Sequence, residues 1–243
     1  MKKKFLSIVL ASSILAVGAF ADAKSDVLNK IQNITFIKKA GFKVLKVKKE
    51  GSTYVVKATH PRMPQAMLFV AGDLKTVAIG TGFTAKGQQI QFLTNMKQFK
   101  KQAIYTTGKG KKDYYMFTDA ECPFCQQFER AMKYLKKDVK LHVYLFPLSF
   151  HPHSISMSKY ILSLKTDAQR AKAMEDIANG DKSYVNAKYS DAQNKEYKKI
   201  IADSTALGNK LGVRGTPTVY DEAGHSINWP TLLDKGWQKG SKK

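Results

Sequence analysis

Alternating apolar and polar positions mark residues 42–85. The stretch FKVLKVKKEGSTYVVKAT alternates, breaks at residues 50–52 and alternates again, which predicts a β-hairpin. The stretch QAMLFVAGDLKTVAIGTGFTA repeats this pattern around a turn at residues 72–73. Before both, residues 25–39 are typical of a helix that runs into an irregular turn. We therefore expect residues 22–85 to form a small sheet-rich domain with one leading helix.

A second pattern follows directly. Apolar side chains recur every third residue at Ile90, Leu93, Met96 and Phe99, and lysines and glutamines fill the positions between them. This spacing indicates an amphipathic helix. We expect residues 86–109 to form a linker helix between two domains.

The third region, residues 110–243, mixes strand and helix patterns. It begins with an apolar strand, DYYMFTDA, then a helix that starts within ECPFCQQFERAM, then a second apolar strand, VKLHVYLFPL. Residues 154–210 are mostly helical, and GTPTVYDEAGHSIN follows as strand, turn and strand. The fold class predicted for the whole chain is α+β.

The first 21 residues have the pattern of an export signal. Three lysines at positions 2–4 precede an apolar run over residues 5–17, and Ala19-Phe20-Ala21 is a small-x-small cleavage site. A membrane anchor is the alternative, but the run is shorter than the ~20 residues that a spanning helix needs and contains serines. We expect cleavage after Ala21 and a protein that resides outside the cytosol, where disulfides persist.

The charge is strongly positive. The net charge is +22, and removal of the three signal lysines leaves +19. A nucleic-acid-binding protein clusters its basic residues and interleaves them with aromatics. The lysines here are spread along the chain, so we expect a basic solvated surface and no nucleic-acid partner.

The chain contains two cysteines, Cys122 and Cys125, in the sequence CPFC. A structural zinc site needs four ligands, and the remaining candidates, His151 and His153, lack the usual spacing, so we expect no metal. A disulfide between residues three apart closes a very small loop and constrains the unfolded chain little. Redox chemistry is the interpretation that remains.

The position of the pair favours that chemistry. At the start of a helix, Cys122 lies near the positive end of the helix dipole and near free backbone N–H groups, which lower a thiol pKa. Pro123 suits the first helical turn because its missing N–H has no partner there. Cys125 lies one turn inward and can attack a mixed disulfide on Cys122. Glu121 opposes the thiolate, so we expect a moderately lowered pKa.

A third motif lies about 90 residues downstream. In LGVRGTPTVY, Thr216-Pro217 precedes a β-rich segment and looks like the cis-proline loop of the thioredoxin fold. With FTDAECPFCQQF upstream, the chain resembles the bacterial periplasmic disulfide isomerases of the DsbC/DsbG type. The resemblance extends over nearly the whole chain after residue 21.

The resemblance implies an N-terminal cystatin-like sheet domain, a linker helix and a C-terminal thioredoxin-like domain with a helical insertion. It also implies a homodimer that joins through residues 22–85, a periplasmic location and no cofactor. By the same match, Cys122 is the nucleophile and Cys125 the resolving cysteine. Thr216 and Pro217, with Pro123 and Phe124 of the active-site turn, contact the substrate.

Three functions follow as hypotheses. The first is isomerisation or reduction of non-native disulfides in unfolded or misoxidised exported proteins, with a membrane redox partner that reduces or oxidises the CPFC pair. The second is net oxidation, in which the Cys122–Cys125 disulfide is donated to clients. The third is a binding role, that of a chaperone whose cleft holds unfolded clients, alone or alongside catalysis.

Overall fold

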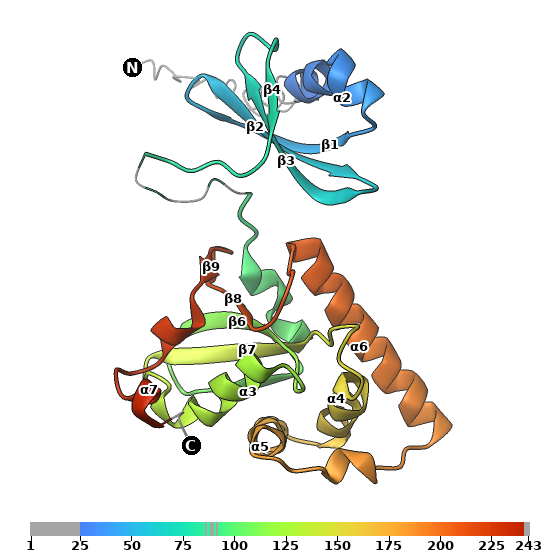
Figure 1. The fold of residues 1–243 in the computed structure, drawn as a ribbon, viewed down its shortest axis with the longest axis vertical. Coiled ribbons are helices and arrows are strands. Elements are labelled where there is room, and N and C mark those ends of the chain that lie inside the picture. Colours follow the sequence, from blue (N-terminus) through green and yellow to red (C-terminus); the bar gives the residue numbers. More distant parts are fainter. Residues whose placement is uncertain (1–24, 86, 88–89, 91, 241–243) are drawn as a thin grey trace, which may run out of the picture. The chain divides into compact units, whose positions relative to one another are not determined.

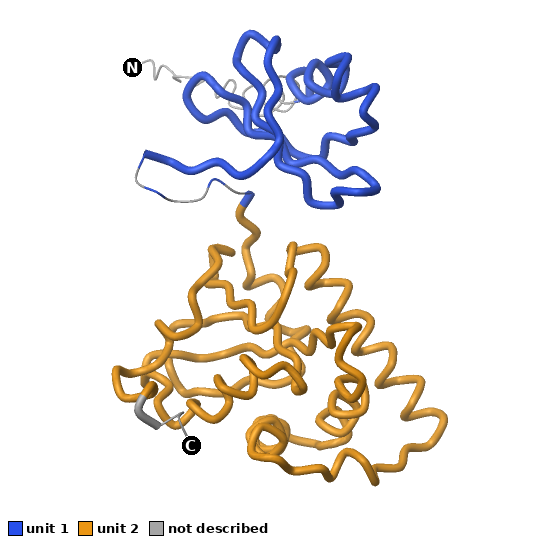
Figure 2. The backbone as a smooth tube through the Cα atoms, in the orientation of Figure 1, with its two compact units in different colours: residues 1–92 blue, residues 93–243 orange. Residues whose placement is uncertain are grey.

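A computed structural model describes residues 25–85, 87, 90 and 92–240. The expected signal peptide, residues 1–21, lies outside the described residues. The chain divides into two compact units, residues 1–92 and residues 93–243 (Figure 2). Within the described ranges, no helix combines the length and the hydropathy that crossing a membrane requires.

The first unit is an antiparallel sheet with a helical segment (Figure 1). Residues 25–32 are helical, and after a break at residues 33–34 the short helix α2 (Thr35–Lys39) follows. The sheet has the order β1-β2-β3-β4, and its strands are β1 (Lys43–Glu50), β2 (Thr53–His60), β3 (Met63–Ala71) and β4 (Val77–Ile79).

Both predicted hairpins are present. Glu50 pairs with Thr53 across the first turn, where Gly51 has a φ of 58°, a conformation that glycine adopts without strain. Val70 pairs with Val77 across the second turn. A third turn, in which His60 pairs with Met63, joins the hairpins into one meander. The inward-facing residues of this sheet close a core with the helical segment, and this core contains Ile31, Ile37, Val56, Leu68 and Val70.

The second unit is built on a five-stranded mixed sheet with the order β5-β7-β6-β8-β9. Its strands are β5 (Tyr105–Thr107), β6 (Lys112–Thr118), β7 (Val139–Leu145), β8 (Thr218–Tyr220) and β9 (Ser226–Ile227). Strands β6 and β7 are parallel, and the other neighbours are antiparallel. The predicted β-α-β unit is therefore present.

Helices fill the intervals between these strands (Figure 1). Helix α3 (Pro123–Arg130) and the 3₁₀ helix η2 (Met132–Tyr134) lie between β6 and β7 in the chain. The helical insertion between β7 and β8 contains α4 (Ser154–Ser163), α5 (Asp167–Ala178), η3 (Ser183–Val185) and α6 (Asp191–Leu211). Beyond β9 come η4 (Trp229–Leu232) and α7 (Trp237–Gly240).

Alternation along β6 and β7 sends side chains to both faces of the sheet. Met116 and Val143 belong to one cluster of buried residues, which includes Phe128 of α3. Phe117 and Tyr144 belong to another, and their rings stack with centroids 4.9 Å apart. Because both faces of the sheet are covered, the sequences of β6 and β7 are nearly continuous apolar runs.

The predicted linker helix over residues 86–109 is wrong. Residues 92–95 are not helical, a 3₁₀ helix η1 occupies Met96–Gln102, and β5 pairs with β7 inside the second unit. The physical reason lies in the spacing, since an apolar repeat of three matches the 3.0 residues per turn of a 3₁₀ helix and not the 3.6 of an α-helix.

The run of glycine and lysine after β5 is also not a linker. Gly110 packs so closely against the chain before β7 that an added Cβ would lie 1.9 Å from the carbonyl carbon of Asp138. Gly108 has a φ of 80°. These residues form the tight connection between β5 and β6, so the second unit begins near residue 93 and not at residue 110.

Candidate active site

The two cysteines lie where β6 passes into α3. Strand β6 ends at Thr118, and a turn closed by the hydrogen bond from Cys122 N–H to the Asp119 carbonyl leads into the helix. Cys122 is the N-cap residue of α3, and Pro123 is its first helical residue. The proline needs no hydrogen-bond partner for its nitrogen at this position. The helix therefore starts where the sequence predicted.

The Cys122 sulfur faces the loop that precedes β8. Its side chain is buried, and Sγ donates to the backbone carbonyl of Thr216 over 3.3 Å. The Thr216–Pro217 peptide bond is cis, as expected from the sequence. Two motifs 94 residues apart are thus in direct contact.

The environment of Cys122 favours its thiolate. Its pKa is lowered to about 5, mainly by the hydrogen bond from the Cys125 thiol, against the opposing effect of burial. Hydrogen bonds from the backbone N–H groups of Phe124 and Cys125 contribute further. The pKa is lower than the moderate decrease expected from sequence. Glu121, which was expected to oppose ionisation, instead accepts a hydrogen bond from the His153 N–H over 2.7 Å.

Cys125 has the opposite character. It is 1% exposed, and burial, followed by its interactions with Cys122, raises its pKa well above that of an ordinary thiol. The Asp119 N–H donates to Cys125 Sγ over 3.4 Å. Both cysteines are free thiols in this structure. At neutral pH the geometry therefore favours a thiolate at Cys122 and a protonated, more deeply buried thiol at Cys125.

A direct test is the ionisation of Cys122. We expect the thiolate absorbance of the reduced protein to titrate with a midpoint near pH 5, because the pKa of Cys122 is lowered to about 5. The measurement is ultraviolet absorbance against pH, with Cys122→Ser as the control that removes this transition. A midpoint near the ~8.5 of a free cysteine would contradict the assigned environment.

The dipeptide between the cysteines is at the surface. Pro123 is exposed, and the Phe124 side chain is 64% exposed although it is apolar. Phe150, in the segment after β7, is 73% exposed and packs edge-on against the His151 ring. The structure thus leaves Phe124 accessible next to the cysteines, while Thr216 and Pro217 are half-buried.

Sequence reasoning missed a buried carboxylate in the active-site turn. Asp119 is fully buried, and it accepts hydrogen bonds from two backbone N–H groups, a serine hydroxyl and a histidine ring. A carboxylate directly after a buried strand is the signal that could have identified it, because a charge at that depth needs hydrogen-bond partners.

A second missed group is Glu129 of α3. It is 5% exposed, and burial, together with the charge of Glu175, raises its pKa to about 8. It lies four residues after Cys125, so both residues share one face of the helix. That spacing is visible in the sequence, but the burial of this face is not.

The histidines considered as zinc ligands have other roles. His151 Nδ1 lies 2.7 Å from Asp119 Oδ2, and the His153 ring is near Tyr184. Among the described residues, no group of three or more His, Cys, Asp or Glu side chains is placed to hold a metal ion.

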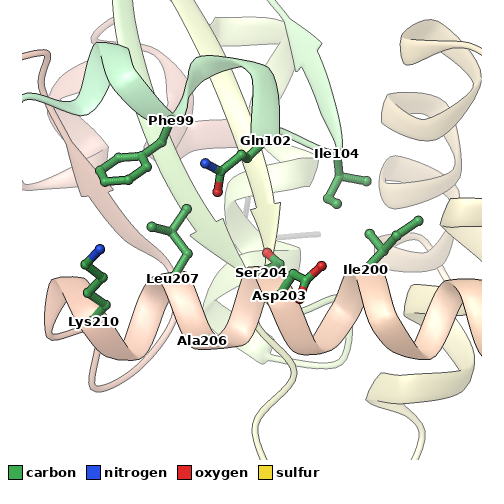
Figure 3. Close-up of a pocket in the computed structure, with 9 residues that line it drawn as sticks. All are labelled: Phe99, Gln102, Ile104, Ile200, Asp203, Ser204, Ala206, Leu207 and Lys210. Carbon is green, nitrogen blue, oxygen red and sulfur yellow. The ribbon is translucent and has the colours of Figure 1, made fainter.

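A pocket of about 530 Å³ lies elsewhere in the second unit, between η1 and α6 (Figure 3). Apolar side chains such as Phe99, Ile104 and Leu207 line it, together with the buried hydroxyl of Ser204. None of the site residues predicted from sequence is among the residues that line it.

Comparisons with known proteins agree with this geometry. A model of the thioredoxin-like domain family matches residues 99–231. A probable thiol:disulfide interchange protein DsbC of Bordetella avium is 29% identical over 115 residues, which are 47% of this chain and 37% of the relative. The chain thus matches little more than a third of the length of that relative.

Two solved structures are also similar. A disulfide interchange protein of Neisseria gonorrhoeae has 25% identity and a TM-score of 0.44, and the match covers 59% of this chain and 99% of the other. DsbG of Helicobacter pylori has 14% identity and a TM-score of 0.37, with coverage of 81% and 99%.

The resemblance to proteins of the DsbC/DsbG type is confirmed by the family model and the Bordetella relative, and the α+β fold class is confirmed as well. The family model covers more than half of the chain and includes β5 to β9, with both cysteines and the Thr216–Pro217 loop. This chain belongs to the thioredoxin-like domain family.

Proposed function

We propose that this protein is a periplasmic thiol–disulfide oxidoreductase that isomerises or reduces non-native disulfides in exported proteins. The observation that carries the proposal is the buried N-cap thiol of Cys122, whose pKa is lowered to about 5 beside the Thr216–Pro217 loop. A thiolate, and not a thiol, is the nucleophile in disulfide exchange. The Bordetella relative, which is named a probable thiol:disulfide interchange protein DsbC, supports the same reaction.

The reaction begins at Cys122. Its thiolate attacks one sulfur of a client disulfide, a mixed disulfide forms, and the other client sulfur leaves as a thiolate. In isomerisation, a client thiolate then attacks the mixed disulfide and releases Cys122. In reduction, Cys125 attacks Cys122 Sγ, and the client leaves with both of its thiols reduced. The high pKa of Cys125 delays this second route, because the protonated thiol does not attack.

The client lies against the loop and the dipeptide that flank the sulfur. The Thr216 carbonyl accepts from Cys122 Sγ, which places the Thr216–Pro217 backbone beside the reacting atom. An extended peptide there pairs with backbone groups as an added strand does. Phe124, exposed next to Cys122, offers apolar contact to an unfolded client.

Net oxidation is the competing reaction at the same cysteines. A thiol of low pKa is a good leaving group, which makes a Cys122–Cys125 disulfide easy to reduce and therefore oxidising. The test is the redox state of the pair in cells, trapped by acid and alkylation. A reduced pair supports isomerase or reductase action with a reducing membrane partner, whereas an oxidised pair supports net oxidation and would overturn the first proposal.

A chaperone role is a second candidate, favoured by exposed apolar side chains. Phe124, Phe150 and Ile155 are 64%, 73% and 44% exposed. Suppression of client aggregation that persists in Cys122→Ala would support a binding function that is separate from redox chemistry.

We also propose a homodimer joined through residues 22–85, and this makes a testable prediction. Within that range β1 and β4 are the two edges of the sheet, and an unpaired edge strand is a liability that pairing with a second copy removes. Light scattering of the processed protein at micromolar concentration is expected to give about twice the mass of one chain. A Leu45→Glu substitution on β1 and an Ile79→Lys substitution on β4 identify the edge that pairs, and a monomer mass for the unmodified protein would contradict the proposal.

A further inference from the structure

We infer that Asp119 is a positioning residue for Cys125: its carboxylate fixes the turn whose backbone N–H donates to the Cys125 sulfur, and so sets the rate at which Cys125 resolves mixed disulfides. This inference rests on the proposed function, because it concerns the second step of the same exchange. Asp119 does not contact a substrate.

The carboxylate is fully paired at zero exposure. Oδ1 accepts from the Glu121 N–H over 2.9 Å and from the Ser154 hydroxyl over 2.6 Å. Oδ2 accepts from the Leu148 N–H over 2.8 Å and lies 2.7 Å from His151 Nδ1. A carboxylate only accepts, and four partners satisfy both of its oxygens, so the residue is held in one position.

The four partners come from two separate parts of the chain. One belongs to the active-site turn itself, and the other three lie in residues 148–154, which lead from β7 to the first turn of α4. The carboxylate therefore joins this segment to the turn. Bonds of this kind are stronger in a site without water, and leaving such a group unpaired there is costly.

The same residue contacts Cys125 through its backbone. The Asp119 N–H donates to Cys125 Sγ over 3.4 Å, and this hydrogen bond favours the thiolate of Cys125. Burial opposes that thiolate strongly. The Asp119 N–H therefore matters most when Cys125 must ionise in order to attack the mixed disulfide. The Asp119 side chain has no hydrogen bond to the Cys122 sulfur, which is bound instead by Thr216 and by α3.

The step can be written with a small substrate, glutathione disulfide. The Cys122 thiolate attacks it, forms a Cys122–glutathione mixed disulfide and releases one glutathione thiolate. Cys125 then loses its proton to water and attacks Cys122 Sγ. The Cys122–Cys125 bond forms, the bond to glutathione breaks, and a second glutathione leaves as a thiolate that takes up a proton. The two cysteines are oxidised, and the disulfide is reduced.

The experiment follows both steps in the reduced protein after addition of glutathione disulfide, with acid quenching and mass spectrometry of the adduct. In Asp119→Asn, an amide group replaces one acceptor oxygen of the carboxylate. The active-site turn therefore loses part of the hydrogen bonding that holds it in place. We expect decay of the adduct to slow by about tenfold, the effect of one weakened charge-assisted hydrogen bond, and alkylation of Cys122 by iodoacetamide to stay within about twofold.

A matched control is Asp221→Asn. The Asp221 carboxylate also holds a turn, by accepting from the N–H groups of Gly224 and His225 and from the His225 ring, but its turn lies between β8 and β9. This variant is expected to leave decay of the adduct unchanged.

A second pair of variants changes His151, which contacts Asp119 and not the cysteines. His151→Phe removes the ring nitrogen that faces Asp119 Oδ2 and is expected to slow decay of the adduct. His151→Asn keeps an N–H donor of similar reach and is expected to restore most of the rate. If Asp119→Asn does not fold, these two His151 variants still test whether Asp119 positions Cys125.

The outcomes separate the two proposals. If wild-type protein forms no Cys122–glutathione adduct, the proposed function fails. If the adduct forms and decays at the wild-type rate in folded Asp119→Asn, or in His151→Phe, the role of Asp119 is overturned and the function is not. Adduct decay that slows equally in Asp119→Asn and Asp221→Asn would also overturn the role of Asp119. So would a loss of Cys122 alkylation in Asp119→Asn that matches the slowing of adduct decay.

Discussion

Replacing Cys122 with alanine is expected to abolish insulin reduction and disulfide reshuffling. The variant lacks the thiol whose pKa is lowered to about 5, and the remaining Cys125 is 1% exposed with a pKa raised well above that of an ordinary thiol. A buried, protonated thiol neither reaches a client disulfide nor attacks it. The measurement is the rate of insulin reduction with glutathione as reductant, together with the recovery of a client that was oxidised with wrong pairings.

Cys125→Ala provides the matched variant. It retains the attacking thiol but lacks the resolving one, so client proteins are expected to accumulate as mixed disulfides on Cys122, visible on non-reducing gels. The same variant also loses the main hydrogen bond to Cys122, so the pKa of Cys122 is expected to rise. Faster iodoacetamide labelling of Cys125 than of Cys122 in the wild-type protein would show that the two roles have been assigned the wrong way round.

Glu129→Gln is expected to stabilise the protein at pH 8 by on the order of 4 kcal/mol. The folded pKa of Glu129 is raised to about 8 by burial and by Glu175, whereas the unfolded value is near 4.5. Between these values the folded state holds a proton that the unfolded state has lost. The stability of the wild-type protein therefore falls as pH rises from about 4.5 to about 8, and glutamine, which is neutral throughout, removes that loss.

The measurement is the free energy of unfolding by urea at several pH values. The difference between Glu129→Gln and wild type isolates the contribution of this residue, because the other titrating groups remain in both proteins. The difference is expected to be small below pH 4.5 and to reach its maximum above pH 8. Glu175→Gln is the control: its side chain is 51% exposed, so only a small part of the effect is expected. Parallel pH curves for Glu129→Gln and wild type would contradict the buried, protonated state of Glu129.

The sequence by itself determined the features that depend on neighbours in the chain. Alternation with a period of two marked the two hairpins of the first unit, because side chains of a strand point to opposite faces. An apolar strand followed by CPFC and an amphipathic segment located the start of α3, and Pro123 identified its first residue. The Thr216–Pro217 motif was recognisable from a family resemblance.

The tertiary structure alone decided which segments form part of the sheet. Residues 105–107 are strand-forming residue types that the sequence analysis assigned to a linker helix, and they form β5 because they pair with the edge of β7. The apolar repeat of three became a 3₁₀ helix whose Met96 and Phe99 side chains fill a core with Tyr144 and Leu207. No local pattern contains these partners, since they lie far away in the chain.

The electrostatics of the site depend on the fold for the same reason. Cys122 meets the carbonyl of Thr216 across 94 residues of sequence, and Asp119 gathers donors from a segment about 30 residues away. Glu129 is polar in the sequence but buried in the fold, which raises its pKa. The type of a residue and its position in a helix are known from the sequence. Its exposure to water and its distant hydrogen-bond partners are set by tertiary packing. Because exposure and partners determine the pKa of a side chain, that pKa depends on the fold.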